Sequence, residues 1–263
     1  MPRRRISRDA VISAISLCLA FSVWPALAAA QEDTLRIGSV AVSSISPGVD
    51  TVDIYNVQNG ARTLTRVSVV HRTHEQHQGR SVLRILAQDG STKTDARLDP
   101  ATLQLIRFER VAATDSTTFT LDGTCFSGWS DVPNKPRRAI QCVPAADRFG
   151  SGALDAMLIS ALPLRSGWSA RVATFDAFGD ITSYPLRAIR MDTIRVGTRD
   201  YAAWQVERIQ GGSASRQGGG SAPQIEVKTT WWVSVATVRV LQERQTVTIQ
   251  GTTRESLRVL RNP

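Results

Sequence analysis

Apolar and polar side chains alternate along most of this chain. In many short segments every second residue is large and apolar, and the residues between are polar, charged or small. A period of two turns one side of a strand toward a core and the other toward water. The pattern predicts strands over residues 35–40, 63–69, 82–86, 102–108, 117–121, 168–175, 186–191, 194–196, 203–209, 225–235, 238–249 and 256–260. Turn-forming residues bound these segments, which indicates a mainly β fold such as a meander, a sandwich or a barrel.

One segment between the strand-rich halves has helical spacing instead. Its apolar residues recur every three or four positions: Leu154, Met157, Leu158, Ala161 and Leu162. Ser151 can cap the N-terminus of such a helix, and Pro163 ends it. We predict a single helix of about three turns, which must bury its apolar side on the sheet and can cover a curved sheet.

The N-terminal segment has the features of a secretory leader. Four arginines within residues 3–8 precede an apolar run over residues 10–23, and Pro25 and a stretch of small residues follow. This order is typical of a cleavable signal peptide, with cleavage after Ala30 or Ala28. The apolar run is shorter than the ~20 residues that cross a membrane, although an uncleaved anchor is the alternative. We expect a protein exported to the periplasm or the external medium, with residues 1–30 removed.

The remaining residues, 31–263, are expected to form one β-rich domain without a transmembrane span. Residues 211–222 contain no apolar side chain larger than alanine. Such a stretch cannot offset the entropy of ordering by burial, so we predict a mobile loop that joins two paired strands.

The cysteine pattern predicts one disulfide. Cys125 and Cys142 are the only cysteines after the leader, and turn-forming residues lie between them over 130–136. An even pair in an exported protein favours a disulfide across a hairpin or long loop, and a pair of buried thiols is the alternative. A redox-active role is not expected, because such sites use a C-x-x-C spacing.

The chain carries a formal charge of +9. The leader contains four arginines and one aspartate, which leaves +6 on residues 31–263. A positive protein can attract anionic lipid or nucleic acid. Here the arginines are scattered singly through the strands, which is typical of solvated strand faces, and no nucleic acid is expected as a partner.

A cluster of histidines raises the question of a metal site. His71, His74 and His77 are the only histidines in the chain. If they extend a strand, His71 and His77 share one face while His74 points to the other, and the spacing differs from the H-E-x-x-H motif. We expect a polar end of a hairpin, without a metal or another cofactor.

Catalytic motifs are also missing from the sequence. It has no G-x-S-x-G elbow, no S-x-x-K and no phosphate-binding glycine loop. Dispersed carboxylates could in principle include a hydrolase pair: Asp122, Asp147, Asp155, Asp176 and Asp180. We assign no catalytic residue and expect a protein that is not an enzyme.

Large aromatic residues in the predicted strands are the candidate ligand-binding residues. They are Trp168, Phe175, Trp204 and Trp231. Trp232 follows Trp231 directly, so one of the two faces inward and the other outward. These side chains either fill an ordinary core or line the concave side of a curved sheet, where they would hold an acyl chain or another apolar ligand.

The C-terminal part of the chain resembles a known family. The residues that carry the resemblance are the helix junction LISALPLRSG at 158–167, the hairpin of 192–197 and 201–206, and the segments 230–234 and 238–241. They are similar to uncharacterised bacterial envelope proteins that are known only as a domain of unknown function. That family resembles periplasmic lipoprotein carriers (LolA/LolB-like) in build. The resemblance implies a curved antiparallel sheet or incomplete β-barrel with one helix on its concave side, and it brings no catalytic residues. The N-terminal half matches only loosely, and the loop between the cysteines lies outside the family pattern.

These observations support three hypotheses of different classes. The first is a non-enzymatic envelope protein that binds a lipid or another apolar ligand in the curved sheet. The second is a structural or adaptor module that contacts an envelope protein through a sheet edge. The third is a hydrolase that uses two of the dispersed carboxylates.

Overall fold

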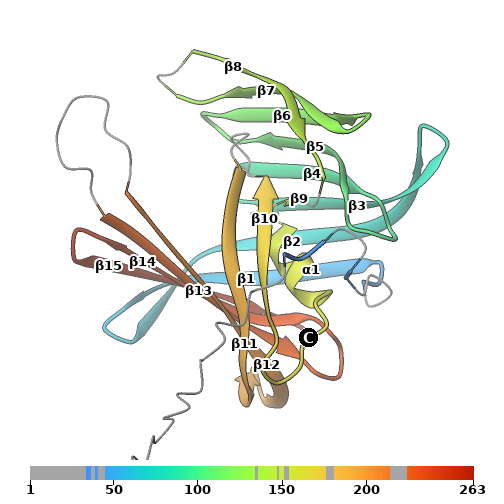
Figure 1. Cartoon of the computed structure of the whole chain (residues 1–263). Coiled ribbons are helices and arrows are strands. Elements are labelled where there is room, and N and C mark those ends of the chain that lie inside the picture. Colours follow the sequence, from blue (N-terminus) through green and yellow to red (C-terminus); the bar gives the residue numbers. More distant parts are fainter. Residues whose placement is uncertain are drawn as a thin grey trace, which may run out of the picture. The chain divides into compact units, whose positions relative to one another are not determined.

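The strands of this protein form one long sheet (Figure 1). The computed structural model describes residues 34–36, 39–40, 45–133, 136–146, 148–150, 154–175, 181–213 and 224–263. Within these residues, fifteen strands lie in the order β8-β7-β6-β5-β4-β3-β2-β1-β15-β14-β13-β12-β11-β10-β9. Neighbouring strands are antiparallel except for β9 and β10, which are parallel. The mainly β fold with an unclosed, curved sheet is therefore confirmed.

The first half of the chain builds one arm of the sheet as a continuous meander. Each strand of this arm pairs with the strand that follows it in sequence. The strands are β1 (Gly48–Gln58), β2 (Ala61–His77), β3 (Arg80–Asp89), β4 (Thr92–Leu98), β5 (Leu105–Val111), β6 (Ser116–Asp122), β7 (Cys125–Asp131) and β8 (Arg138–Pro144).

The second half builds the other arm and returns to the centre. Its strands are β9 (Arg148–Gly150), β10 (Ser169–Phe175), β11 (Ile181–Val196), β12 (Arg199–Ser213), β13 (Gln224–Ser234), β14 (Val240–Ile249) and β15 (Thr252–Leu260). The last strand pairs with the first, with Ile54 opposite Arg258 and Val52 opposite Leu260. The two ends of the sheet are therefore β8 and β9, which follow each other in sequence.

The sheet curls so that its two arms pack against each other through the inner face. Pro144 ends β8 and Arg148 begins β9, so a short connection joins the two ends of the strand order. The rings of Phe126 in β7 and Phe175 in β10 stack with centroids 5.2 Å apart. Both belong to one large core cluster, which also contains residues of the helix segment.

The single described helix, α1 (Asp155–Ser160), is shorter than the sequence predicted. We expected about three turns beginning at Ser151. Instead Leu154 occupies the N-cap without a side-chain hydrogen bond, and Ser151 lies outside the described residues. The predicted apolar stripe is nevertheless buried, with Leu154 and Leu158 in the main core. Burial on the sheet, rather than a cap, therefore holds this short helix.

Several strand predictions need correction. Within the segment 35–40, the described residues 35–36 and 39–40 do not belong to a strand. Thr34 makes only an isolated bridge to Arg171, and residues 37–38 lie outside the described part. The segments 186–191 and 194–196 belong to one strand, β11, with an irregularity between Ala188 and Arg190. Five strands were missed: β1, β4, β7, β8 and β9.

The described residues bear on two predictions, the loop over residues 211–222 and the absence of a transmembrane span. The predicted loop 211–222 joins β12 and β13, which do pair with each other, but β12 extends to Ser213. The predicted leader and residues 214–223 lie outside the described part. Among the described residues, no helix has the length and apolar character needed to cross a membrane.

Candidate functional site

The candidate site is a cavity of about 620 Å³ at the centre of the inner face. Strands β1–β5 form one wall, and β14 and β15 form another. Helix α1 contributes Ala156, Met157 and Ser160, and the segment between β13 and β14 contributes Thr237 to Arg239. A volume of this size is in the range of sites that hold small organic ligands.

Apolar side chains form one part of the wall. Ile54, Ile85, Phe108 and Leu260 are buried and line the cavity, and Met157 of α1 lies against the same core. Ile85 of β3 and Phe108 of β5 also belong to the main core, because the cavity side of these two strands is the side that packs in the core. At these two residues the apolar lining of the cavity is continuous with the main core.

Charged side chains form the other part of the wall. The charged lining residues are five arginines and three carboxylates: Arg66, Arg72, Arg110, Arg239, Arg258, Asp50, Asp89 and Glu243. Charged groups at a concave surface next to apolar side chains are a feature of ligand sites, where they fix the orientation of the ligand.

Asp50 is the acceptor for two arginines. It lies in β1 on the same side as Val52 and Ile54, and its side chain is 12% exposed. Arg72 in β2 donates to Asp50 through both terminal nitrogens, with Nη2 at 3.3 Å from Oδ1, and its Nε donates to the Ser46 carbonyl at 3.0 Å. Arg239 donates to the same carboxylate from the segment after β13.

The other arginines of the lining each have a separate carboxylate partner. Arg66 Nε lies 2.5 Å from Asp89 Oδ1, and Arg258 Nε lies 3.8 Å from Glu243 Oε1. Arg110 pairs with Asp115, which is not part of the lining. Burial lowers the pKa of Arg110, although an arginine stays protonated under ordinary conditions.

The aromatic residues proposed from the sequence lie in or against the core rather than on the cavity wall. Trp168, Phe175 and Trp231 are buried in the main cluster, and Trp204 packs against it half-buried. None of the four is among the residues that line the cavity. Ligand binding by these side chains stays a prediction.

Trp231 nevertheless has a direct connection to the cavity wall. Its indole Nε1 donates a hydrogen bond to Glu243 Oε2 at 3.2 Å, and the two residues are opposite each other in the pairing of β13 and β14. Because Trp231 is 1% exposed, its donor needs a partner, and Glu243 supplies it. The ring thereby fixes one carboxylate of the lining.

A second polar group is buried next to Trp231. The guanidinium of Arg208 lies 4.7 Å from the ring of Tyr184 and 5.4 Å from that of Trp231. It donates to Thr229 Oγ1 at 3.1 Å and lies 3.7 Å from Asp155 at the start of α1. Burial, together with the charge of Asp155, raises the pKa of Tyr184, so its phenol stays protonated.

The histidines and the carboxylates considered as candidate site residues lie at separate places in the described part of the chain. His71 and His74 are exposed on β2 and His77 ends that strand, and the described residues contain no group of three metal-ligating side chains. Of the five dispersed carboxylates, Asp122 is exposed at the end of β6 and Asp155 pairs with Arg208. The other three lie outside the described residues.

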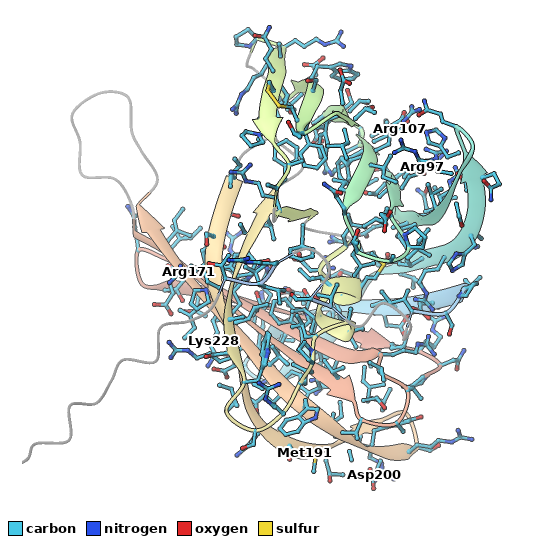
Figure 2. The ribbon with its side chains drawn as sticks, turned by 45° about the vertical axis from the view of Figure 1, so that its right-hand side comes forward. Arg97, Arg107, Arg171, Met191, Asp200 and Lys228 are labelled. Carbon is cyan, nitrogen blue, oxygen red and sulfur yellow. A yellow bond between two sulfur atoms is a disulfide. The ribbon has the colours of Figure 1, made fainter. Side chains whose placement is uncertain are left out.

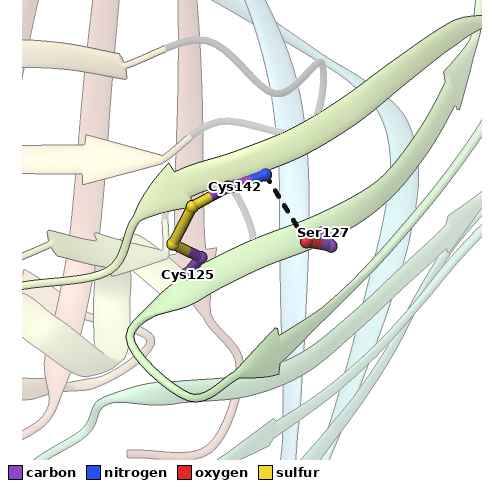
Figure 3. The surroundings of a disulfide bond; sticks show 3 residues. All are labelled: Cys125, Ser127 and Cys142. Carbon is purple, nitrogen blue, oxygen red and sulfur yellow. Dashed lines mark hydrogen bonds between the residues drawn. A yellow bond between two sulfur atoms is a disulfide. The ribbon is translucent and has the colours of Figure 1, made fainter.

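The predicted disulfide is present. Cys125 and Cys142 are bonded, and their Cα atoms are 4.6 Å apart (Figure 3). The bond ties β7 to β8, and the backbone N–H of Cys142 donates to Ser127 Oγ at 3.5 Å. The two cysteines therefore lie across a hairpin, as the sequence predicted, at one end of the sheet.

A network of charges covers the outer side of β2–β4. Arg84 donates to Asp95 at 2.5 and 3.0 Å, and Arg97 donates to Glu75 at 2.9 Å. Arg97 lies opposite Arg107 of β5 (Figure 2). Burial alone would raise the pKa of Asp95, but the hydrogen bond and charge of Arg84 and the charge of Arg97 lower it below its usual value.

The residues around Asp50 were missed by the sequence analysis. The available signal was the position of Asp50, two residues before Val52 and four before Ile54, on the side of β1 that is otherwise apolar. A charge at such a position needs a partner or a function. The partner Arg239 is 189 residues away, so only the fold identifies it.

Comparisons with known proteins find only distant structural similarity. No protein-family model and no curated protein matches this chain. Among solved structures, a protein with a YmcC-like fold from Bacteroides fragilis, described as exported, is similar with a TM-score of 0.33 and 10% identity, over 87% of this chain and 99% of the other. A β-barrel-like protein of the domain of unknown function DUF1849 from Brucella abortus has a TM-score of 0.30 and 10% identity, over 82% and 97% of the two chains.

Proposed function

We propose that this protein is an exported, non-enzymatic binding protein that holds a lipid or another amphipathic ligand in the cavity of its curved sheet. The observation that carries the proposal is a cavity of about 620 Å³ that is lined by both apolar and charged side chains. An amphipathic molecule matches both kinds of side chain, because its chain removes apolar surface from water while its polar end meets the charged groups.

The compartment is part of the proposal. The arginine-rich start, the apolar run and the small residues before Gln31 favour export by a cleavable signal peptide. The disulfide between Cys125 and Cys142 supports an oxidising compartment. The resemblance of residues 158–241 to proteins built like periplasmic lipoprotein carriers supports a role in the bacterial envelope.

The experiment is ligand uptake with a variant that fills the cavity. Ala87 is buried in β3 and lines the cavity, so Ala87→Trp places a large ring inside it. Ala202→Trp makes the same substitution at an exposed position of β12 and is the matched control. We expect the unmodified protein and Ala202→Trp to bind a fluorescent fatty acid, and Ala87→Trp to lose at least about tenfold in affinity.

Two results would count against ligand binding. One is a protein that takes up no fluorescent fatty acid and carries no bound lipid in native mass spectrometry when purified from its own envelope. The other is equal binding by the unmodified protein and a folded Ala87→Trp variant. In the second case the probe would bind elsewhere on the surface.

An adaptor role is the second candidate, and the position of β8 favours it. This strand ends the strand order and pairs only with β7 among the described residues. An unpaired strand edge can accept a strand from another protein. Mild crosslinking in cells followed by affinity purification tests this role, and a partner crosslinked to β8 would support it over ligand binding.

A further inference from the structure

The lining of the cavity carries more positive than negative charges, and the unbalanced positive charge lies where two arginines share Asp50. Five arginines and three carboxylates line the cavity. Arg66 and Arg258 each have a carboxylate of the lining as partner, and Arg110 pairs with Asp115 outside it. Arg72 and Arg239, in contrast, share Asp50. One positive charge is therefore left over at this point.

The two arginines differ in how far their donors are used. All three side-chain nitrogens of Arg72 donate hydrogen bonds: Nε donates to the Ser46 carbonyl, and both terminal nitrogens donate to Asp50. Arg239 donates to Asp50 through Nη2, and its buried Nε has no hydrogen-bond partner among the described residues. A guanidinium has five N–H donors, so Arg239 keeps unused donors at the cavity.

A row of apolar side chains extends from this pair in one direction. Arg72 in β2 is opposite Ile85 in β3, Ile85 is opposite Ala96 in β4, and Ala96 is opposite Phe108 in β5. This row of side chains runs across the inner face from the charged pair into the main core. In the other direction, β14 and β15 present the ion pair of Glu243 and Arg258.

We propose that the ligand is an amphiphile with one acyl chain and one negative charge, whose anionic group binds Arg239 and Arg72 beside Asp50 and whose chain lies toward Ile85, Phe108 and Met157. This inference rests on the proposed function and specifies its ligand. A single negative charge balances the single excess charge, and hydrogen bonds between guanidinium and anion are among the stronger ones in proteins. A carboxylate and a phosphodiester share this chemistry.

The experiment compares three ligands by equilibrium dialysis with labelled compounds. Palmitate and lysophosphatidylglycerol each have one acyl chain and one negative charge, whereas hexadecanol has the chain without the charge. We expect the protein to bind at least one of the two anions about tenfold or more tightly than hexadecanol. Binding of palmitate alone identifies a free fatty acid as the ligand, and binding of lysophosphatidylglycerol alone identifies a phospholipid. Either result supports the proposal.

Three variants test the assignment to Arg239. Arg239→Gln should weaken binding of the preferred anion by about tenfold and leave hexadecanol unchanged, while Arg239→Lys keeps the charge and should retain most of the affinity. Arg66→Gln removes the same charge from the same cavity, at an arginine that has its own partner, and should change anion binding much less. A thermal melt of each variant checks that it is folded.

The outcomes separate this inference from the proposed function. If palmitate, lysophosphatidylglycerol and hexadecanol all fail to bind, the proposed function fails and the inference with it. If hexadecanol binds as tightly as the anions, or if Arg66→Gln weakens anion binding as much as Arg239→Gln does, the cavity still holds an apolar ligand but the anionic site at Asp50 is wrong.

Discussion

The rings of Phe119 and Phe175 meet edge to face with their centroids 4.4 Å apart. Phe119 lies in β6, near one end of the strand order, and Phe175 ends β10, near the other. No backbone ladder joins β6 to β10 in the described part of the chain. The contact of these rings, together with Phe126, therefore joins the two arms through side chains in the core, in addition to the backbone pairing of β1 with β15.

Replacement of Phe175 should therefore have a large effect on stability. Phe175 is 1% exposed, and Phe175→Ala leaves a void where two other rings meet. We expect the free energy of unfolding to fall by about 3–5 kcal/mol in urea titrations. Met191→Ala on β11 is the control, since Met191 is 57% exposed (Figure 2) and should cost less than about 0.5 kcal/mol. Equal effects of the two substitutions would mean that the arms do not depend on this contact.

Gly128 should tolerate no side chain, because the backbone of β6 lies directly against it. It lies opposite Phe119 in the pairing of β6 and β7. A Cβ at this position would meet the carbonyl oxygen of Thr118 at 2.0 Å and the Cα of Phe119 at 2.6 Å, and both are backbone atoms that cannot turn aside. We expect Gly128→Ala to destabilise the protein by about 3 kcal/mol or more.

The neighbouring position provides the control for Gly128. Ser127 is exposed on the same strand, and Ser127→Ala should change the melting temperature by only a few degrees. A well-folded Gly128→Ala variant with an unchanged melting temperature would show that β7 can shift away from β6.

Two of the five strands that the sequence did not reveal, β1 and β4, line the cavity. The period-two signal depends on an apolar inner side, but a cavity with a charged wall needs polar residues there. On β1 the inner side begins with Asp50, and on β4 it includes Thr94. Neither strand therefore alternates clearly. The same polar lining explains why both were missed.

Strand β2 was predicted correctly as a strand, although polar residues on it also face the cavity. The segment 63–69 was predicted as a strand from the spacing of its apolar residues, and it is one. Yet Arg66 and Ser68 line the cavity, and Val67 and Val69 lie on the other side of the strand. The alternation identified the element correctly, but it could not tell which side faces inward.

The fold class and the disulfide depended on local patterns, so the sequence was sufficient for them. The candidate site was not predictable in this way, because Asp50 and Arg239 meet only after β15 returns to β1 and brings the segment after β13 over the cavity. The aromatic residues were a reasonable choice of ligand-binding residues. In the structure these rings pack in or against the main core, and none of them lines the cavity.

Removal of the disulfide should lower stability without unfolding the protein. Cys125 and Cys142 close a loop with a sequence separation of 17, for which the chain-entropy model gives about 3 kcal/mol. We expect the Cys125→Ser, Cys142→Ser double variant to unfold at a lower urea concentration, and a reducing agent to shift the unmodified protein to the same midpoint. If the reducing agent also shifted the double variant, its effect would have to come from another source.

Acid should weaken the charge network on the outer side of β2–β4. Arg84 and Arg97 lower the pKa of Asp95 in the folded protein, so folding favours the ionised carboxylate. The resulting stabilisation is present at pH values above the unfolded pKa of about 4 and is lost as the pH falls through the lower, folded pKa.

The measurement compares Asp95→Asn with the unmodified protein over a range of pH. Asp95 is partly solvated, so we expect a difference in unfolding free energy of about 1 kcal/mol at pH 7, which should shrink toward zero as the pH falls below about 4. Asp122→Asn, at an exposed turn, should give curves parallel to those of the unmodified protein. A difference for Asp95→Asn that stays constant down to the acid transition would mean that the side chain acts through packing or neutral hydrogen bonds and not through its charge.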